Sequence, residues 1–371
     1  MPFDIPFIRP RFPASDLIAA DYDAIVASNW FSNFGPKERE FASMISEFVG
    51  QDVHAVTTAN ATIGLMALLH SALGHGDGSR HIIVPSFTFA AGPEAIEWCG
   101  FRPLFIDIDA ETLQPSLTSA RSAVAGFDVA GVLLCNSFGI GNPEIGAWAT
   151  WAESADLPLL IDSAAGFGSR YGDGLRLGAA GAAEVFSFHA TKPFAIGEGG
   201  AIVTRDDELA ARLKAFQNFG FGGDRQVASL GLNGKLSELS AAIGIRQFED
   251  FDASLLRRQA TLDGYRRRLD ASWHMPEGAG ASSVCFATAV APDAAAADAA
   301  YDRLIAGGVE ARRYYQPVVH HQTHFASAPR AGELAVTEDI ASRILSLPVH
   351  DGVGETQLDL IARLIDPSVD R

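Results

Sequence analysis

The sequence predicts an α/β protein whose mostly parallel sheet is covered by helices on both faces, followed by a smaller α+β domain. Three observations support this. Short apolar runs alternate with helical stretches from about residue 56 onward. The runs are bounded by Gly, Pro and Asp, as is typical of strands buried on both faces. The pattern changes after Asp270. Strands that alternate with helices pair mainly in parallel.

The individual elements follow from these patterns. The predicted strands of the large sheet are residues 81–86, 103–108, 131–136, 158–162, 184–188 and 201–204. The clearest predicted helices are residues 14–28, 36–49, 207–218, 237–251 and 255–269. In the C-terminal part we expect strands at 284–290 and 309–315 and helices at 292–306 and 356–365.

Length and composition limit the possible classes of protein. A chain of 371 residues exceeds one ordinary core, so we expect a large domain over 1–250 and a small domain over 251–371. The formal net charge of -17 argues against nucleic-acid binding. No apolar run reaches the ~20 residues of a membrane span, and no signal peptide is evident. The three cysteines are far apart, which predicts a cytoplasmic protein without a disulfide framework or metal site.

Ligands of open α/β sheets bind where the strands end, so polar residues at those points are candidate site residues. Asn60 and Thr62 begin a predicted helix, where free N–H groups could bind a phosphate; taken alone, plain helix capping explains them better. Asp162 ends the apolar run 159–161, where a carboxylate needs a cationic partner. That partner could be a protonated pyridine nitrogen; a helix cap or a structural ion pair explains Asp162 equally.

A lysine in a glycine-rich context is the third candidate. Lys192 follows the strand that contains Ser187, and the segment 197–200 after it reads Gly-Glu-Gly-Gly. Most lysines are surface charges, but glycines allow close approach of the backbone to a ligand, and a lysine in such a site can form a Schiff base. A fourth segment, 231–238, contains Asn233 and leads into a helix; the helix start alone explains it.

Together these segments resemble the DegT/DnrJ/StrS family of sugar aminotransferases, which are fold-type I pyridoxal 5'-phosphate (PLP) enzymes. The resemblance covers nearly the whole chain and rests on the order and spacing of short motifs. They are Asn-Phe-Gly-Pro at 33–36, Asn-Ala-Thr at 60–62, Pro-Ser-Phe-Thr-Phe at 85–89, Phe-Ile-Asp-Ile-Asp at 105–109, Ile-Asp-Ser-Ala-Ala at 161–165, the segment 187–192, and Leu-Ser-Leu-Pro at 345–348.

The resemblance implies a role for each matched residue. Lys192 would hold PLP as a Schiff base and move protons, and Asp162 would hold the pyridine nitrogen. The other implied cofactor contacts are ring stacking by Phe89, phosphate binding by Ala61, Thr62 and Ser187, and binding of the neighbouring subunit's phosphate by Asn233. The last contact implies a homodimer with shared active sites. His320 would lie near the substrate, although His321 is adjacent to it.

One position departs from the family pattern. Family members commonly carry Gln or His three residues after the aspartate, where it can bond the ring hydroxyl of PLP. This chain has Ala165 there, which has no side-chain donor. We expect Asn136, at the end of the preceding strand, to make this bond instead.

The implied reaction is transfer of an amino group from glutamate to a nucleotide-linked keto-deoxysugar, in surface polysaccharide or secondary-metabolite biosynthesis. The segments 33–36 and 188–192 favour the 4-amino-4,6-dideoxy sugar branch. Candidate diphosphate contacts are Lys37, Arg225 and Arg313, although for any one of them a solvated surface charge is the better explanation.

Two alternatives are open. One is a PLP-dependent sugar dehydratase, against which the retained Lys192 and the scattered cysteines argue. The other is a PLP-binding regulatory protein without catalytic activity.

Overall fold

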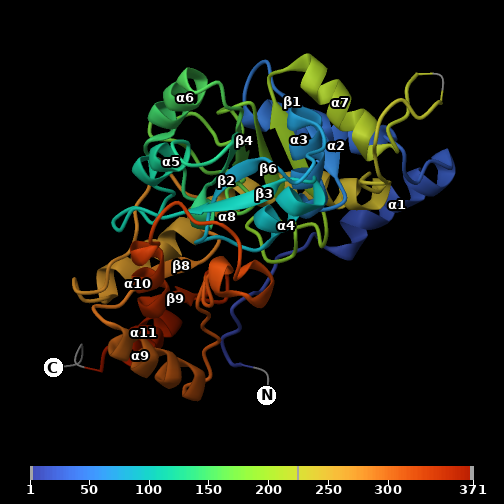
Figure 1. Ribbon diagram of the computed structural model, residues 1–371. Coiled ribbons are helices and arrows are strands. Elements are labelled where there is room, and N and C mark those ends of the chain that lie inside the picture. The colour runs from blue at the N-terminus through green and yellow to red at the C-terminus, as the bar shows by residue number, and fades with distance from the viewer. Residues whose placement is uncertain (1–2, 224, 368–371) are drawn as a thin grey trace.

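The computed structural model describes residues 3–223 and 225–367 (Figure 1). The first two residues of the predicted large domain and the last four of the predicted small domain therefore lie outside the described residues. A seven-stranded sheet forms the larger part, in the order β1-β7-β6-β5-β4-β2-β3. Its strands are β1 His54–Thr58, β2 His81–Pro85, β3 Arg102–Ile106, β4 Val129–Cys135, β5 Leu159–Asp162, β6 Ala183–Ser187 and β7 Gly200–Thr204. All pairings from β6 to β3 are parallel, and β7 pairs antiparallel with both neighbours.

Helices cover both faces of this sheet because successive strand residues point to opposite sides. Leu160 packs in the cluster formed with α3 Ala61–Leu73, α4 Ala91–Trp98 and α7 Asp207–Gln217. Its neighbours Leu159 and Ile161 pack on the other face with α5 Leu117–Ala123 and α6 Ile145–Ser154. Further along that face, Phe186 packs with α2 Pro36–Val49 and α8 Glu238–Arg268. The predicted α/β class with a mostly parallel sheet is confirmed.

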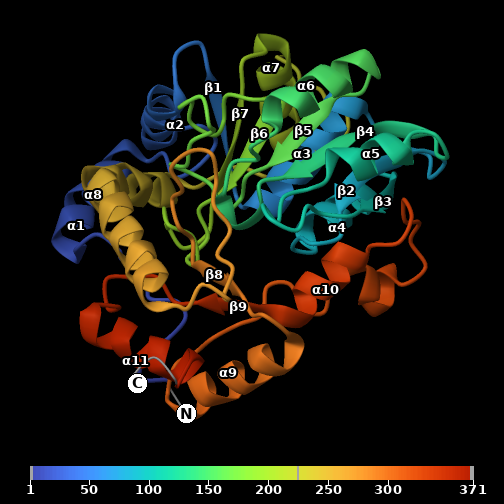
Figure 2. The ribbon, with the colours of Figure 1, turned by 90° about the vertical axis from the view of Figure 1, so that its left-hand side faces the viewer.

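The smaller part is built on two antiparallel strands, β8 Ala287–Val290 and β9 Ile344–Leu347 (Figure 2). Helices α9 Ala294–Ala306 and α11 Glu355–Ile365 pack against these strands, together with the C-terminal half of α8. Ile5 from the N-terminal segment also enters this cluster. Helix α10 Ala335–Arg343 begins against the large sheet, because the side chain of Asp107 accepts hydrogen bonds from the N–H groups of Val336 and Thr337.

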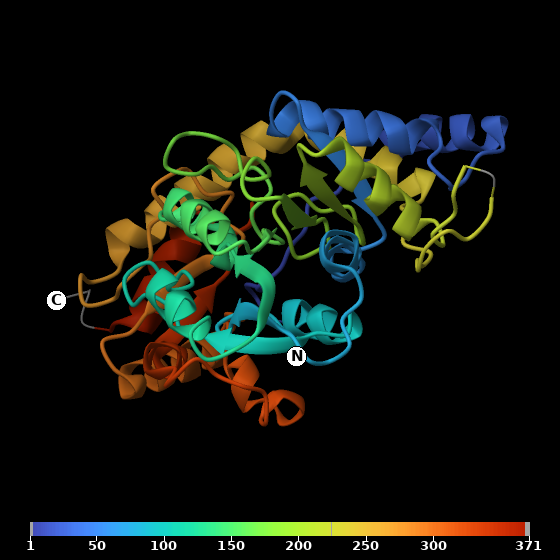
Figure 3. The same cartoon turned by 45° about the horizontal axis from the view of Figure 1, so that its top comes forward.

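Helix α1, Ser15–Ser28, and α2 lie along α8 (Figure 3). A loop, described over residues 219–223 and 225–232, extends from the molecule at the same end as α1 (Figures 1 and 3). Short helical turns η1 Ser137–Gly139, η2 Val319–His321 and η3 Thr323–Phe325 complete the described elements. Among the described residues, none of the helices has the length and apolar character needed to cross a membrane.

The observed elements correct several predictions. The two helices expected at 237–251 and 255–269 are one continuous helix, α8. The domain division at residue 250 lies within α8 and stays a prediction. Residues 309–315 form no strand and make only single bridges, at Val309 and Arg312. Strands β1 and β9 were not predicted.

The crossing of α2 and α8 supplies a stability prediction. A Cβ atom at Gly244 would lie 2.4 Å from the ring of Phe41, which is fully buried. We therefore expect Gly244→Ala to lower the free energy of unfolding by about 1–3 kcal/mol. The control is Gly146→Ala in α6, where nothing lies within 4 Å of the new atom; it should stay within about 1 kcal/mol of the parent. Urea unfolding measures both, and equal effects would contradict the prediction.

Candidate active site

A cavity of about 650 Å³ lies where the parallel strands end. Large-domain residues in its wall follow β2, β4, β5 and β6 or begin α3, as expected for an open α/β sheet. Residues of the small part close it from the other side, namely Cys285, Phe286, Tyr314 and Tyr315. The predicted residues that line it are Ala61, Thr62, Phe89, Asn136, Asp162, Ser187 and Lys192.

Asp162 is a buried carboxylate with an incomplete set of partners. Its Oδ1 accepts the N–H of Ala164 at 2.9 Å, and its Oδ2 has no hydrogen bond within the described chain. Burial raises the pKa of Asp162, while the Ala164 N–H and the charge of Lys192 lower it. A cation placed against Oδ2 would relieve this cost, and a protonated pyridine nitrogen is such a cation.

The first turn of α3 offers free donors to the cavity. The side chain of Asn60 caps the helix by accepting the N–H of Ile63 at 3.0 Å. The N–H groups of Ala61 and Thr62 precede the first helical hydrogen bonds and remain available to an anion. Gly200 keeps this place open, because a Cβ there would lie 3.2 Å from the nitrogen of Ala61. A phosphate group fits these donors together with the hydroxyl groups of Thr62 and Ser187.

Lys192 lies in a loop after β6 that is held by hydrogen bonds between its own backbone groups. Its N–H donates to the carbonyl of His189 at 2.9 Å, and the N–H of Ala190 donates to the carbonyl of Gly197 at 2.9 Å. The Nζ of Lys192 makes no hydrogen bond or ion pair with the residues the structure describes, and the side chain lines the cavity. An amine held there without a partner is free to react with a carbonyl group.

Aromatic side chains form much of the remaining wall. Phe89 is 65% exposed, which leaves its ring face open for stacking. Tyr315 stacks on Phe138 with ring centroids 5.8 Å apart. The sequence alone indicated no role for Tyr314 or Tyr315. Their arrival at the cavity depends on the packing of the two parts of the chain, which no local pattern encodes.

Asn136 lines the cavity, but its amide is engaged within the protein. Its Nδ2 donates to Ser163 Oγ at 2.8 Å and to Tyr171 Oη at 3.0 Å. Its Oδ1 accepts the N–H of Asn142 at 2.9 Å. Both hydroxyl groups in turn donate to the buried Glu184 carboxylate, at 2.6 and 3.0 Å. An N–H bond from Asn136 to a ring hydroxyl therefore requires that one of these bonds be released.

The other predicted residues lie outside the cavity. Asn233 is exposed, and so is Arg225 on the extended loop. Lys37 forms ion pairs with Asp21 and Glu40 at 3.0 and 3.1 Å. Arg313 pairs with Asp298 at 2.6 Å and packs over the ring of Tyr301. His320 is fully buried between Ser86 and Glu338.

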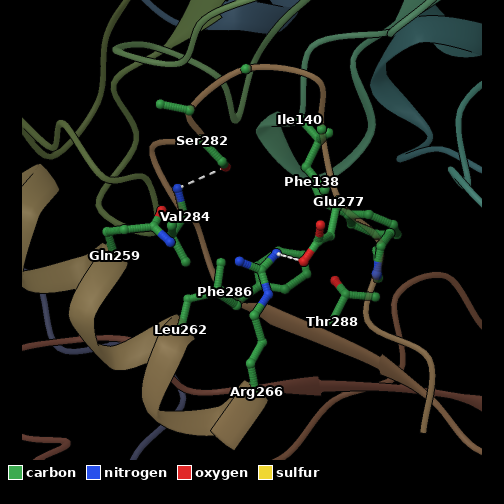
Figure 4. A pocket seen from close by; sticks show the side chains of 14 residues that line it. Phe138, Ile140, Gln259, Leu262, Arg266, Glu277, Ser282, Val284, Phe286 and Thr288 are labelled. Atoms are coloured by element: carbon green, nitrogen blue, oxygen red, sulfur yellow. Dashed lines mark hydrogen bonds and ion pairs between the residues drawn. The ribbon is translucent and has the colours of Figure 1, made fainter. Parts of the chain in front are cut away.

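A second cavity of about 250 Å³ lies behind the active-site wall (Figure 4). Phe138 and Phe286 line both cavities and separate them. The guanidinium group of Arg266 reaches into the smaller one and lies 3.4 Å from the Glu277 carboxylate (Figure 4). None of the predicted cofactor or substrate residues lines it.

A reactive lysine, an unpaired buried carboxylate and a helix start with free donors converge in one cavity. The fold and this site define a PLP-dependent aminotransferase of fold type I. A family model matches residues 15–366. The chain belongs to the DegT/DnrJ/EryC1/StrS aminotransferase family.

Individual relatives agree with this assignment. The chain is 47% identical to protein Rv3402c of Mycobacterium tuberculosis over 97% of its own length and 88% of that protein. It is 28% identical to dTDP-4-amino-4,6-dideoxy-D-glucose transaminase of Shigella dysenteriae over 96% and 97% of the two chains. A putative PLP-dependent aminotransferase from Bacillus cereus has a similar crystal structure, with a TM-score of 0.90, 31% identity, and 97% and 99% of the chains covered.

Replacement of Asp162 should lower turnover but raise the stability of the cofactor-free protein. We expect Asp162→Asn to lower turnover by at least about 100-fold, because an amide cannot stabilise a protonated pyridine nitrogen. The cofactor-free variant should be more stable than the parent at neutral pH, because burial raises the pKa of Asp162 and the folded protein bears the cost of its charge.

The gain in stability should shrink as the pH falls toward the ordinary carboxyl pKa of about 4, where the parent side chain is protonated as well. Steady-state kinetics and unfolding across pH measure the two effects. The exposed Asp156→Asn is the matched control and should change neither. A loss of stability at neutral pH in Asp162→Asn would contradict this account.

Proposed function

We propose that the protein transfers an amino group from glutamate to a nucleotide-linked keto-deoxysugar and so produces an amino sugar. The observation that carries this proposal is the convergence of Lys192, Asp162 and the start of α3 in one cavity. The relative from Shigella dysenteriae, whose name specifies a dTDP-linked 4-amino sugar, supports the substrate class and the 4-amino branch.

In this proposal each residue of the chain has a separate task. Asp162 Oδ2 holds the pyridine nitrogen, and the start of α3 with Thr62 and Ser187 holds the phosphate. Phe89 presents its exposed ring face to the cofactor. Bound PLP supplies an electron sink for the reacting carbon. Lys192 Nζ binds the cofactor covalently, and when released it moves a proton as base and then as acid.

In this proposal the ring hydroxyl of PLP lies near Ala165 and Asn136. Ala165 lines the cavity but has no side-chain donor. Since both N–H groups of Asn136 are engaged, the free capacity of its amide is one lone pair on Oδ1. In this state Asn136 Oδ1 accepts a hydrogen bond from the ring hydroxyl. The Nδ2 group can donate to the ring oxygen only after its hydrogen bond to Ser163 or Tyr171 is broken.

A homodimer with shared active sites belongs to the proposal. Asn233 is exposed and lies outside its own cavity, as a residue that serves a neighbouring subunit would. Large apolar side chains are exposed on α1 and on the loop 219–232, at the same end of the molecule (Figure 1). They are Leu17, Tyr22, Val26, Phe219, Phe221, Val227 and Leu230. Apolar groups gathered in this way favour burial against a second subunit.

A groove beside the cavity suits the charged part of the substrate. Arg312 and Arg313 line it, together with Tyr301, Gln316 and two carboxylates, Asp298 and Asp302, and it shares Tyr314 with the cavity. We propose that Arg313 contacts the diphosphate there, after release from Asp298. Lys37 and Arg225 lie outside the cavity, and in this proposal they reach a substrate only across the subunit contact. The paths of the glutamate donor and of its product use the same cavity, as a ping-pong reaction requires.

The proposal is tested first at Lys192. Lys192→Arg keeps the positive charge but cannot form the covalent bond, so we expect turnover to fall by about 10³-fold or more. The fold should be retained, as judged by circular dichroism. The exposed Lys214→Arg on α7 is the control and should keep full activity. Normal turnover by Lys192→Arg would overturn the assignment of the active site.

The amino donor and acceptor are tested separately. Addition of glutamate to the yellow holoenzyme should remove the yellow absorbance as the cofactor takes up the amine, and a dTDP-linked 4-keto-6-deoxysugar should restore it. UDP- and GDP-linked keto-sugars complete the panel. No change with any amino donor would favour a binding-only regulatory protein. Loss of the sugar hydroxyl group without gain of nitrogen would favour the dehydratase.

A further inference from the structure

Two histidines and a glutamate converge on one point outside the active-site cavity. His320 and His321 lie in η2, and Glu338 lies in α10. The Nε2 atoms of the two histidines lie 3.1 and 3.3 Å from the same carboxylate oxygen, Glu338 Oε1. All three atoms lie within 4.8 Å of one another. None of the three residues lines the active-site cavity.

Two of the three separations between these atoms match those of ligands around a metal ion. Zinc binds histidine nitrogen and carboxylate oxygen at about 2.0–2.2 Å in tetrahedral geometry, which places neighbouring ligand atoms about 3.3 Å apart. The two separations to Glu338 Oε1 agree with this value. An ion in the centre of the group would replace the two N–H contacts of the carboxylate with metal bonds.

An outer partner holds the buried histidine, as is usual for a metal ligand. His320 is fully buried, and its Nδ1 lies 2.5 Å from the hydroxyl of the equally buried Ser86. Metal-binding histidines almost always bond their second ring nitrogen in this way, which fixes the ring orientation. When Nδ1 carries the proton and donates it to Ser86, Nε2 presents its lone pair toward Glu338 and the proposed ion.

We propose that His320, His321 and Glu338 bind a divalent transition-metal ion of the zinc class. Imidazole and carboxylate ligands suit zinc, and the exposed side of the group leaves its fourth position to water. The ion joins η2 to the start of α10 and, through Ser86, to the end of β2. Since Ser86 lies two residues before Thr88 in the cavity wall, the ion stabilises the wall without contacting the reactants.

The test is calorimetric titration of the chelator-treated holoenzyme, without a polyhistidine tag, with zinc chloride. We expect one zinc ion per chain and a higher thermal midpoint in its presence. His321→Ala and Glu338→Gln should each weaken zinc binding by at least about tenfold. Both residues are exposed, so these variants should fold without zinc, as far-UV circular dichroism would verify.

The matched control is His324→Ala. His324 is also an exposed histidine, paired with Glu97 at 2.6 Å, but the described residues offer it no third ligand. This variant should bind zinc with the parent's affinity. The proposal is overturned if the parent binds no zinc in a one-to-one ratio, if His321→Ala or Glu338→Gln keeps the parent's affinity, or if His324→Ala loses as much affinity. Binding is measured without turnover, so the result does not depend on the proposed aminotransferase reaction.

Discussion

The unpaired carboxylate of Asp162 is the constraint on which the site depends. The residue ends a strand in the middle of the sheet, where burial raises the pKa of Asp162. The described protein supplies one direct hydrogen bond and the nearby charge of Lys192 in compensation. A charge in this state is costly in the folded protein and stabilises a bound cation. The site is arranged around the place that such a cation occupies.

A second buried carboxylate, Glu184, is stabilised entirely by hydrogen bonds within the protein. Glu184 on the neighbouring strand is fully buried, and burial raises the pKa of Glu184 as well. It accepts hydrogen bonds from Ser163, Tyr171 and the backbone of Ala180. Both carboxylates belong to the same sheet, yet Glu184 has its partners within the chain whereas Asp162 Oδ2 has none among the described residues. This difference in hydrogen-bond partners indicates that Asp162, and not Glu184, is the carboxylate available to a ligand.

Sequence reasoning predicted the parts of the site that depend on local order. Strand ends and helix starts are visible in the sequence, and parallel strands bring those ends to one edge, so Asp162, Ser187, Lys192 and the start of α3 could be placed together. The partners of Asn136 could not, because Tyr171 and Glu184 lie 35 and 48 residues further along the chain. Asn136 follows β4 as predicted, but the use of its amide is decided by long-range packing. The continuity of α8 was missed for a similar reason, since tertiary contacts on both halves sustain a helix that its sequence pattern divides.

The direction of the hydrogen bonds around Asn136 follows from Glu184. The Glu184 carboxylate accepts the hydroxyl protons of both Ser163 and Tyr171. The oxygens of these hydroxyl groups can then only accept from Asn136, which fixes its NH₂ group toward them and its oxygen toward the N–H of Asn142. The Glu184 carboxylate thereby fixes the orientation of the Asn136 amide at the cavity wall. In the proposed PLP site, where Ala165 has no side-chain donor, that orientation would determine whether the ring oxygen of the cofactor meets an N–H group or a lone pair of Asn136.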